Sequence, residues 1–210
     1  MGVKVFLEYI LESEDITTVT ASVLYYLLEN RKNEGLIGFS HQCSFILLLL
    51  SGERSFSIAL NKPFKIKQWS YELDSKPSNF HDFLILIVYK LFTDSSASLL
   101  PLRECLLTII TNTSPYISSI SSNASGKLIK LFLKFSAPKP LLTNEKYHRF
   151  CQFLLEIFNN LIQYQFAGTS FPFSLLSPLF FGPIFACNYL YVLTGKSINR
   201  EPGCSVRDTP

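Results

Sequence analysis

Charged residues are scarce in this sequence of 210 residues: they make up 17% of it, against about 25% in an ordinary soluble domain. The formal net charge is only +3, and no stretch gathers lysine and arginine into a basic stripe. The charge therefore gives no ground for nucleic-acid binding, and we expect no nucleic-acid partner. Hydrophobic residues make up 48% of the chain. A chain this apolar must cover its apolar surface against itself, against the rest of a longer protein or against lipid.

Paired cysteines and targeting segments are also missing. The cysteines are Cys43, Cys105, Cys151, Cys187 and Cys204. Their number is odd, no C-x-x-C pair occurs, and no long apolar signal segment follows the first residue, so we expect reduced thiols in the cytosol. Gly2 fits an N-myristoylation signal, but Phe6 stands where serine or threonine belongs. We therefore predict no lipid anchor at this end.

Groups that carry out catalysis are lacking as well. None of the three histidines, His41, His81 and His148, forms a ligand-spaced pair with another histidine or a cysteine. His81-Asp82 and His148 near Cys151 could be drawn as catalytic pairs, because residues three apart share a helix face. A surface histidine beside a core thiol is the far more common arrangement. We predict no enzyme and no catalytic, cofactor-binding or metal-binding residues.

Two other local motifs have features of functional sites. Gly195-Lys196-Ser197 resembles the end of a phosphate-binding loop, but Leu190 stands where the first glycine of that loop belongs. Glu53 and Arg54 follow a very apolar segment and could contact a partner, but charges at the end of a helix commonly satisfy that end. We favour the structural interpretation for this pair and expect no cofactor.

The sequence is rich in apolar residues at helical spacing. We predict helices over residues 5–31, 36–50, 80–91, 99–113, 128–135 and 145–168, and a short helix opened by Pro115. Residues 36–50 are apolar all round, which favours a buried core helix. Residues 53–79 are expected to form an irregular connector pinned by Phe56, Phe64 and Trp69, although residues 55–60 alternate like a strand. Residues 118–125 are predicted to be a turn.

These segments predict an all-α fold. Helices joined by short polar turns, with little strand signal, indicate stacked antiparallel helices of the armadillo or HEAT type, as a solenoid fragment. We predict a helical part over residues 1–168, an apolar proline-containing tail over 169–195, and a disordered tail over 196–210.

The apolar tail admits two interpretations. Phe171–Leu193 has the length and apolarity of a membrane span, so the chain could be a small integral membrane protein. The segment also holds Pro172, Pro178 and Pro183. These prolines suggest a hairpin, a kinked span or a non-native extension.

Three stretches together resemble the high-temperature-induced dauer-formation protein family and its relative dymeclin. They are Phe45–Arg54 continuing to Leu60–Pro63, Cys105–Ile110 with Ser114–Tyr116, and Phe153–Phe166. The resemblance covers about residues 10–168 and stops after Ser170. Family members are several times longer than this chain and carry a lipid anchor at their own N-terminus. We therefore hypothesise a partial or alternatively spliced product from the middle of the family.

The resemblance implies a role for the chain. The family consists of large, helical, Golgi-associated peripheral proteins that act in secretory traffic, including the sorting of dense-core vesicles and neuropeptides. No catalytic residues are attributed to it, so none are carried over. The resemblance implies a non-enzymatic scaffold that is cytoplasmic and peripherally associated with Golgi membranes. Its expected partners are other proteins of the secretory pathway and the cytoplasmic face of these membranes, with no small-molecule substrate.

Overall fold

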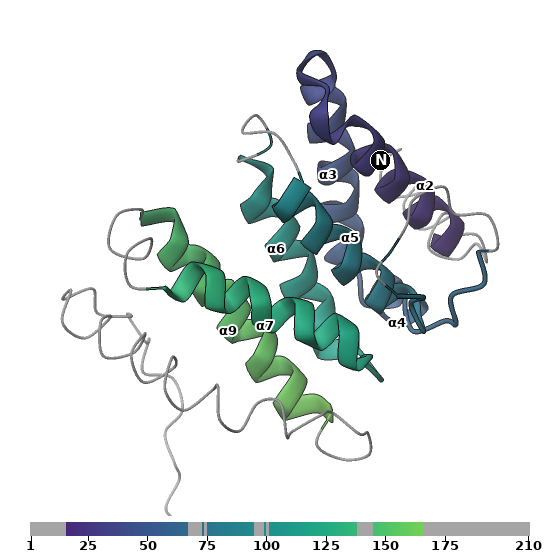
Figure 1. The fold of residues 1–210 in the computed structure, drawn as a ribbon. Coiled ribbons are helices and arrows are strands. Elements are labelled where there is room, and N and C mark those ends of the chain that lie inside the picture. The colour runs from purple at the N-terminus through teal and green to yellow at the C-terminus, as the bar shows by residue number, and fades with distance from the viewer. Residues whose placement is uncertain are drawn as a thin grey trace, which may run out of the picture. The chain divides into compact units, whose positions relative to one another are not determined.

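The described helices follow one another along the chain as Figure 1 shows. The computed structural model describes residues 16–66, 73, 75–94, 99, 101–137 and 145–165. Its helices are α2 (Ile16–Glu29), α3 (Ile37–Ser51), α4 (Arg54–Ala59), α5 (Phe80–Asp94), α6 (Leu102–Thr113), α7 (Ser122–Ser136) and α9 (Glu145–Gln165). Three 3-10 turns cover Asn30–Lys32, Glu34–Leu36 and Ser114–Tyr116. The described residues contain no strand, only one isolated bridge between Pro63 and Asn79, which confirms the all-α class.

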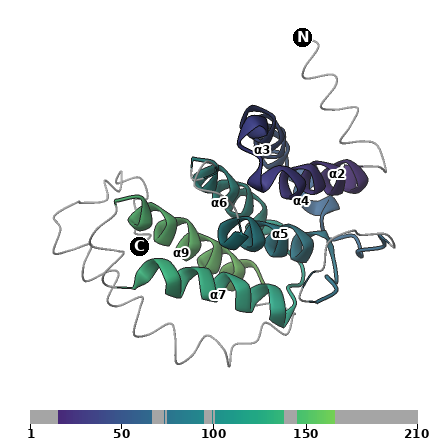
Figure 2. The ribbon, with the colours of Figure 1, turned by 45° about the horizontal axis from the view of Figure 1, so that its top comes forward.

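The longer helices form two rows. Three pairs of helices are in contact: α2 with α3, α5 with α6, and α7 with α9. Between pairs, α2 contacts α5 and α5 contacts α7, while α3 contacts α6 and α6 contacts α9 (Figure 2). This is the neighbour pattern of stacked helix pairs. The closer assignment to the armadillo or HEAT type stays a prediction.

Polar contacts show that α3 and α6 run in the same direction. The Cys105 thiol donates to the carbonyl oxygen of Ser44 over 3.6 Å, and the Asn112 amide donates to the Ser51 hydroxyl over 3.0 Å. Both contacts join residues that are 61 positions apart, so the two helices keep one parallel register along their length. A stack of helix pairs requires this parallel order within a row.

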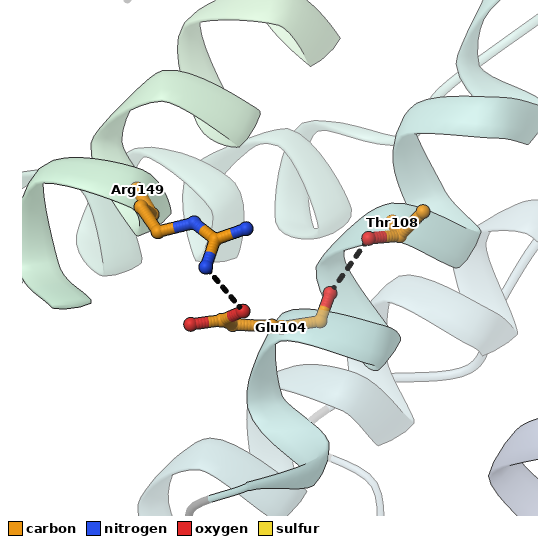
Figure 3. A network of polar contacts seen from close by, with 3 residues as sticks. All are labelled: Glu104, Thr108 and Arg149. Carbon is orange, nitrogen blue, oxygen red and sulfur yellow. Dashed lines mark hydrogen bonds and ion pairs between the residues drawn. The ribbon is translucent and has the colours of Figure 1, made fainter.

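The same order continues from α6 to α9. Near their starts, the Arg149 guanidinium lies 3.2 Å from the Glu104 carboxylate, as Figure 3 shows. Near their ends, the Asn160 amide donates to the Ser114 hydroxyl over 2.9 Å. Glu104 also accepts the Thr108 hydroxyl at its carbonyl oxygen over 2.9 Å. Because Arg149 is largely exposed, its ion pair with Glu104 orients the two helices more than it stabilises them, at about 0–1 kcal/mol.

Aromatic rings join α5, α7 and α9 in one cluster. The ring centroid of Phe135 lies 5.7 Å from that of Phe92 and 5.1 Å from that of Phe150. Tyr147 stacks on Phe135 at 5.3 Å. These spacings are those of favourable tilted and stacked ring pairs. The cluster fixes where the third helix pair meets the second.

The predicted connector is wrong at its start, because residues 54–59 form α4. Phe56 and Leu60 are four residues apart and both buried, so the alternation that resembled a strand also fits one helical turn. The Ser57 hydroxyl donates to the carbonyl oxygen of Glu53 over 3.4 Å. Phe56 and Phe64 are buried as predicted, and Trp69 lies outside the described residues.

The predicted turn over residues 118–125 is also too long. α7 begins at Ser122, because the Ser121 hydroxyl accepts the backbone N–H of Ala124 over 3.2 Å and caps the helix. The short helix opened by Pro115 is present as the 3-10 turn Ser114–Tyr116. The other predicted helices are present where the structure describes them. Residues 5–15 and 166–168 of the predicted helices lie outside it.

We expect Phe135→Ala to lower the free energy of unfolding by about 3–5 kcal/mol, because it empties the centre of the aromatic cluster. Urea unfolding followed by circular dichroism measures this change. Leu133→Ala on the same helix is the matched control: Leu133 is exposed, so the change should stay within about 0.5 kcal/mol. Equal losses in the two variants would contradict the cluster.

Candidate interaction surface

Four of the six buried residues of α3 are small, and four large apolar side chains of this helix are exposed. Its buried residues are Ser40, Cys43, Ser44, Leu47, Leu50 and Ser51. The large apolar side chains of Phe39, Phe45, Ile46 and Leu49 are exposed, and Phe45 is 58% accessible to solvent. We call these four residues the outer face of α3. An exposed apolar patch of this kind marks a surface that another molecule or segment covers.

The small residues explain why α3 has this orientation. A side of serines and a cysteine lets α6 approach the α3 backbone closely, as the contact of Cys105 with the Ser44 carbonyl shows. The Ser51 hydroxyl donates to the Leu48 carbonyl oxygen over 2.7 Å and so satisfies itself within the helix. Leu47 and Leu50 are buried on this helix as well. The other bulky apolar residues, Phe39, Phe45, Ile46 and Leu49, lie on the solvent side.

The surface extends beyond α3 at one edge. Tyr26 of α2 is exposed and meets Phe39 edge to face, with ring centroids 5.9 Å apart. Leu36, just before α3, is exposed as well. No residue of α3 is charged. The surface is therefore uncharged and mostly apolar, with the exposed Gln42 among its apolar residues, which suits a largely apolar helix rather than an acidic or basic partner.

The prediction of a buried core helix over residues 36–50 is wrong for this outer face. Because the sequence pattern of residues 36–50 is apolar all round, it does not indicate which side of the helix is buried. In the structure, the buried side is the one that faces α6. The stretch Glu34–Ser51 is long and apolar enough to cross a membrane by length and composition alone. One such stretch is weak support for a span, because the core helices of soluble proteins pass the same test.

His81 and Asp82 serve the fold. His81 is buried, and this burial lowers the pKa of its imidazole to about 3. The two Asp82 carboxylate oxygens accept the backbone N–H groups of Ser78 and Ser121 over 3.1 and 3.0 Å. Asp82 thereby ties the start of α5 to the start of α7. A base that is engaged in this way is not poised for proton transfer.

The other candidates for chemistry are no closer to a reactive arrangement. Cys151 is fully buried, whereas His148 is half-buried. Burial raises the pKa of the Cys43 and Cys105 thiols, which keeps them protonated and weakly nucleophilic. Among the residues that the structure describes, no group of three or more histidine, cysteine or acidic side chains is placed to hold a metal ion.

The remaining candidates have structural contacts or are not described. The Arg54 guanidinium lies 6.0 Å from the ring centroid of Tyr116, between α4 and the 3-10 turn after α6. This contact agrees with a structural role for the pair Glu53 and Arg54. The phosphate-loop resemblance at Gly195–Ser197 and the apolar segment Phe171–Leu193 lie outside the described residues.

Sequence reasoning missed the outer face of α3, although a pattern for it was present. The small residues Ser40, Cys43, Ser44 and Ser51 lie on one side of the helix, since Ser44 follows Ser40 by four residues and Ser51 follows Ser44 by seven. Such a stripe marks the side of a helix that approaches a neighbour closely. The bulky residues between them could have been assigned to the opposite side.

The fold and this surface define a class of protein: an all-helical stack with an exposed, uncharged apolar helix face. The high-temperature-induced dauer-formation protein family, Hid1, matches residues 3–176. The chain belongs to this family. The all-helical fold and the names within the family point to a non-enzymatic protein.

Named relatives agree with the family. Protein HID1 of mouse (Mus musculus) and protein HID1 of human (Homo sapiens) are each 40% identical to the chain over 167 residues, 80% of this chain and 21% of the relative. Protein HID1 of Dictyostelium discoideum is 40% identical over 165 residues, 79% of this chain and 18% of the relative. The chain therefore spans about a fifth of the length of the curated relatives it matches. No solved structure matches it.

We expect His81 to make the protein less stable as the pH falls. Its pKa is about 3 when folded and about 6.5 when unfolded, so between these values the unfolded chain binds the extra proton. The stability that neutral His81 provides is present above pH 6.5 and is lost progressively towards pH 3. Urea unfolding at a series of pH values from 7.5 to 4 measures how the free energy of unfolding changes with pH. His81→Leu should flatten this pH dependence; the same pH dependence in the variant and the unchanged protein would refute the assignment.

We expect Phe45→Ser to reduce self-association of the isolated chain without lowering its unfolding midpoint, because Phe45 is exposed. Light scattering and urea unfolding measure the two effects. Leu47→Ser is the control on the buried side of the same helix and should destabilise the fold by about 2–5 kcal/mol. Destabilisation by Phe45→Ser to the same extent would show that the outer face is covered in the isolated chain.

Proposed function

We propose that this chain is a section of a non-enzymatic Hid1-type scaffold that works through protein contacts on its helix faces. The observation that carries the proposal is the outer face of α3, where bulky apolar side chains such as Phe45 and Leu49 face solvent. Binding through such a face needs no proton transfer, nucleophile or cofactor, and we propose none. One relative gives independent support for binding. A protein of Schizosaccharomyces pombe that is 24% identical over 167 residues is named as a Ubp5-interacting protein, ftp105.

We further propose that the scaffold acts on the cytoplasmic face of Golgi membranes in secretory traffic, including dense-core vesicle and neuropeptide sorting. Its partners would be other proteins of that pathway. The support is the resemblance to a family of peripheral Golgi proteins, carried by stretches such as Phe45–Arg54 and Phe153–Phe166. The described part of the chain adds a surface for protein contacts. Because the chain spans about a fifth of its relatives, the activity of the whole protein is itself part of the proposal.

A second candidate, a small integral membrane protein, rests on the composition of the tail. Ile157–Gly195 contains no charged residue and no histidine, and Phe171–Leu193 is long enough to span a bilayer. The two candidates differ in how the chain is held on membranes. A peripheral scaffold is held by surface contacts, whereas a spanning segment is held by the hydrocarbon core.

Carbonate extraction separates these candidates. Cells express the full chain or a form without residues 171–210, and their Golgi membranes are washed at alkaline pH. The scaffold proposal expects both forms to sediment with the membranes before the wash and to be released by it, because surface contacts break at high pH. Retention of the full chain alone would favour the integral membrane candidate. Failure of either form to sediment with Golgi membranes would overturn the proposed location.

A further inference from the structure

The outer face of α3 lies opposite its contact with α6. Ser44 and Ser51 make the polar contacts with α6 and lie almost one above the other on the helix. At about 100° per residue, Ile46 is turned by roughly 160° from Ser44, Phe39 and Leu49 by roughly 140°, and Phe45, at the edge of the outer face, by roughly 100°. The exposed side of α3 is therefore the open side of the row that α3, α6 and α9 form (Figure 2).

The composition of α3 is that of a helix inside a row. α6, which has neighbours on two sides, buries apolar residues such as Leu107 and Ile109. α3 has no charged residue and exposes four large apolar side chains, although it has a neighbour in its row on one side only among the described helices. At the other end of the row, α9 exposes polar residues such as Gln152 and Glu156. A stack needs polar outer faces at its ends, and α3 does not supply one.

We propose that the outer face of α3 seats a further helix pair of a Hid1-type chain, which continues the row on the open side of α3. Chain for such a pair exists, because the segment matched here is 21% of the mouse protein and 18% of the Dictyostelium protein. The pair would place an apolar helix on Phe39, Phe45, Ile46 and Leu49, as α6 lies on the opposite side. If the stack follows chain order, this pair precedes the matched segment.

This inference rests on the proposed scaffold function and narrows it in one respect. If the pair is seated, the contacts made by the outer face of α3 are contacts within the scaffold, and partners from outside would bind other helix faces. The outer face is a contact surface between two parts of one scaffold. Binding of any other molecule to this face is an alternative outcome of the test. A second copy of this chain or a lipid surface would be such an occupant.

The experiment measures how fast a thiol on the outer face reacts with a maleimide. Phe45→Cys is placed in the full chain of 210 residues and in a hybrid, which is mouse protein HID1 carrying residues 16–165 of this chain in place of the segment they match. Labelling at the substituted position is read by mass spectrometry, so that the native cysteines do not interfere. Lys62→Cys, on an exposed residue after α4, is the matched control in both proteins.

We expect the thiol at position 45 to react at least about tenfold more slowly in the hybrid than in the full chain, because the seated pair must open before the reagent enters. The thiol at position 62 should react at the same rate in both. Equal rates at position 45 would overturn the proposal. Slow reaction in the full chain that speeds up on dilution would identify a second copy instead, and slowing only upon addition of phosphatidylcholine vesicles would identify lipid.

If the hybrid fails to fold, a second measurement takes its place. The cysteine is then placed in intact mouse protein HID1, at the position that aligns with Phe45, and its labelling is compared before and after unfolding in urea. Protection in the folded protein supports the seat, and its absence overturns it. Carbonate extraction does not depend on what covers α3, so a failure here and a failure of the proposed function remain distinguishable.

Discussion

The contact of α6 with α3 on one side and with α9 on the other is the interaction on which the rest of the stack depends. α6 can lie between two helices because its polar side chains are satisfied locally. The hydroxyls of Thr111 and Thr113 donate to the carbonyl oxygens four residues earlier, over 3.0 and 3.1 Å. Both sides of the helix are thus free for packing. Asn112 and Glu104 of α6 then set the registers of α3 and α9, through their contacts with Ser51 and Arg149.

Sequence patterns were sufficient for the helices that bury one broad stripe. α5 and α9 carry long apolar series at helical spacing, and the structure has both where they were predicted. The pattern failed where a segment is short. Residues 55–60 satisfy the strand and the helix period equally, and contacts from outside the segment decide between them. The start of α7 was missed because its cap, Ser121, stands within a run of serines where any of them could begin a helix.

The candidate surface was harder to predict than the fold, for a physical reason. An all-round apolar helix such as α3 has no amphipathic direction, so the choice of its buried side belongs to its neighbours. α6 meets the side with Ser44 and Ser51, where two backbones come close, and Leu47 is buried on the same helix. Close packing of small side chains gains dispersion contacts along the whole interface. The hydrophobic area left outside, including Phe45 and Ile46, is the cost of that arrangement.

The scarcity of charge and the outer face of α3 have the same explanation under the proposed arrangement. A free-standing domain needs charged residues over most of its surface, but a section inside a longer stack needs them only along its flanks. The described helices differ in this way: α9 exposes polar residues such as Gln152 and Glu156, whereas α3, which has no charge, faces the open end of its row. Under the proposed arrangement, the uncharged face of α3 is surface that other helices cover. The uncharged stretch from Ile157 to Gly195 also lowers the share of charged residues in the whole chain to 17%, and most of it lies outside the described residues.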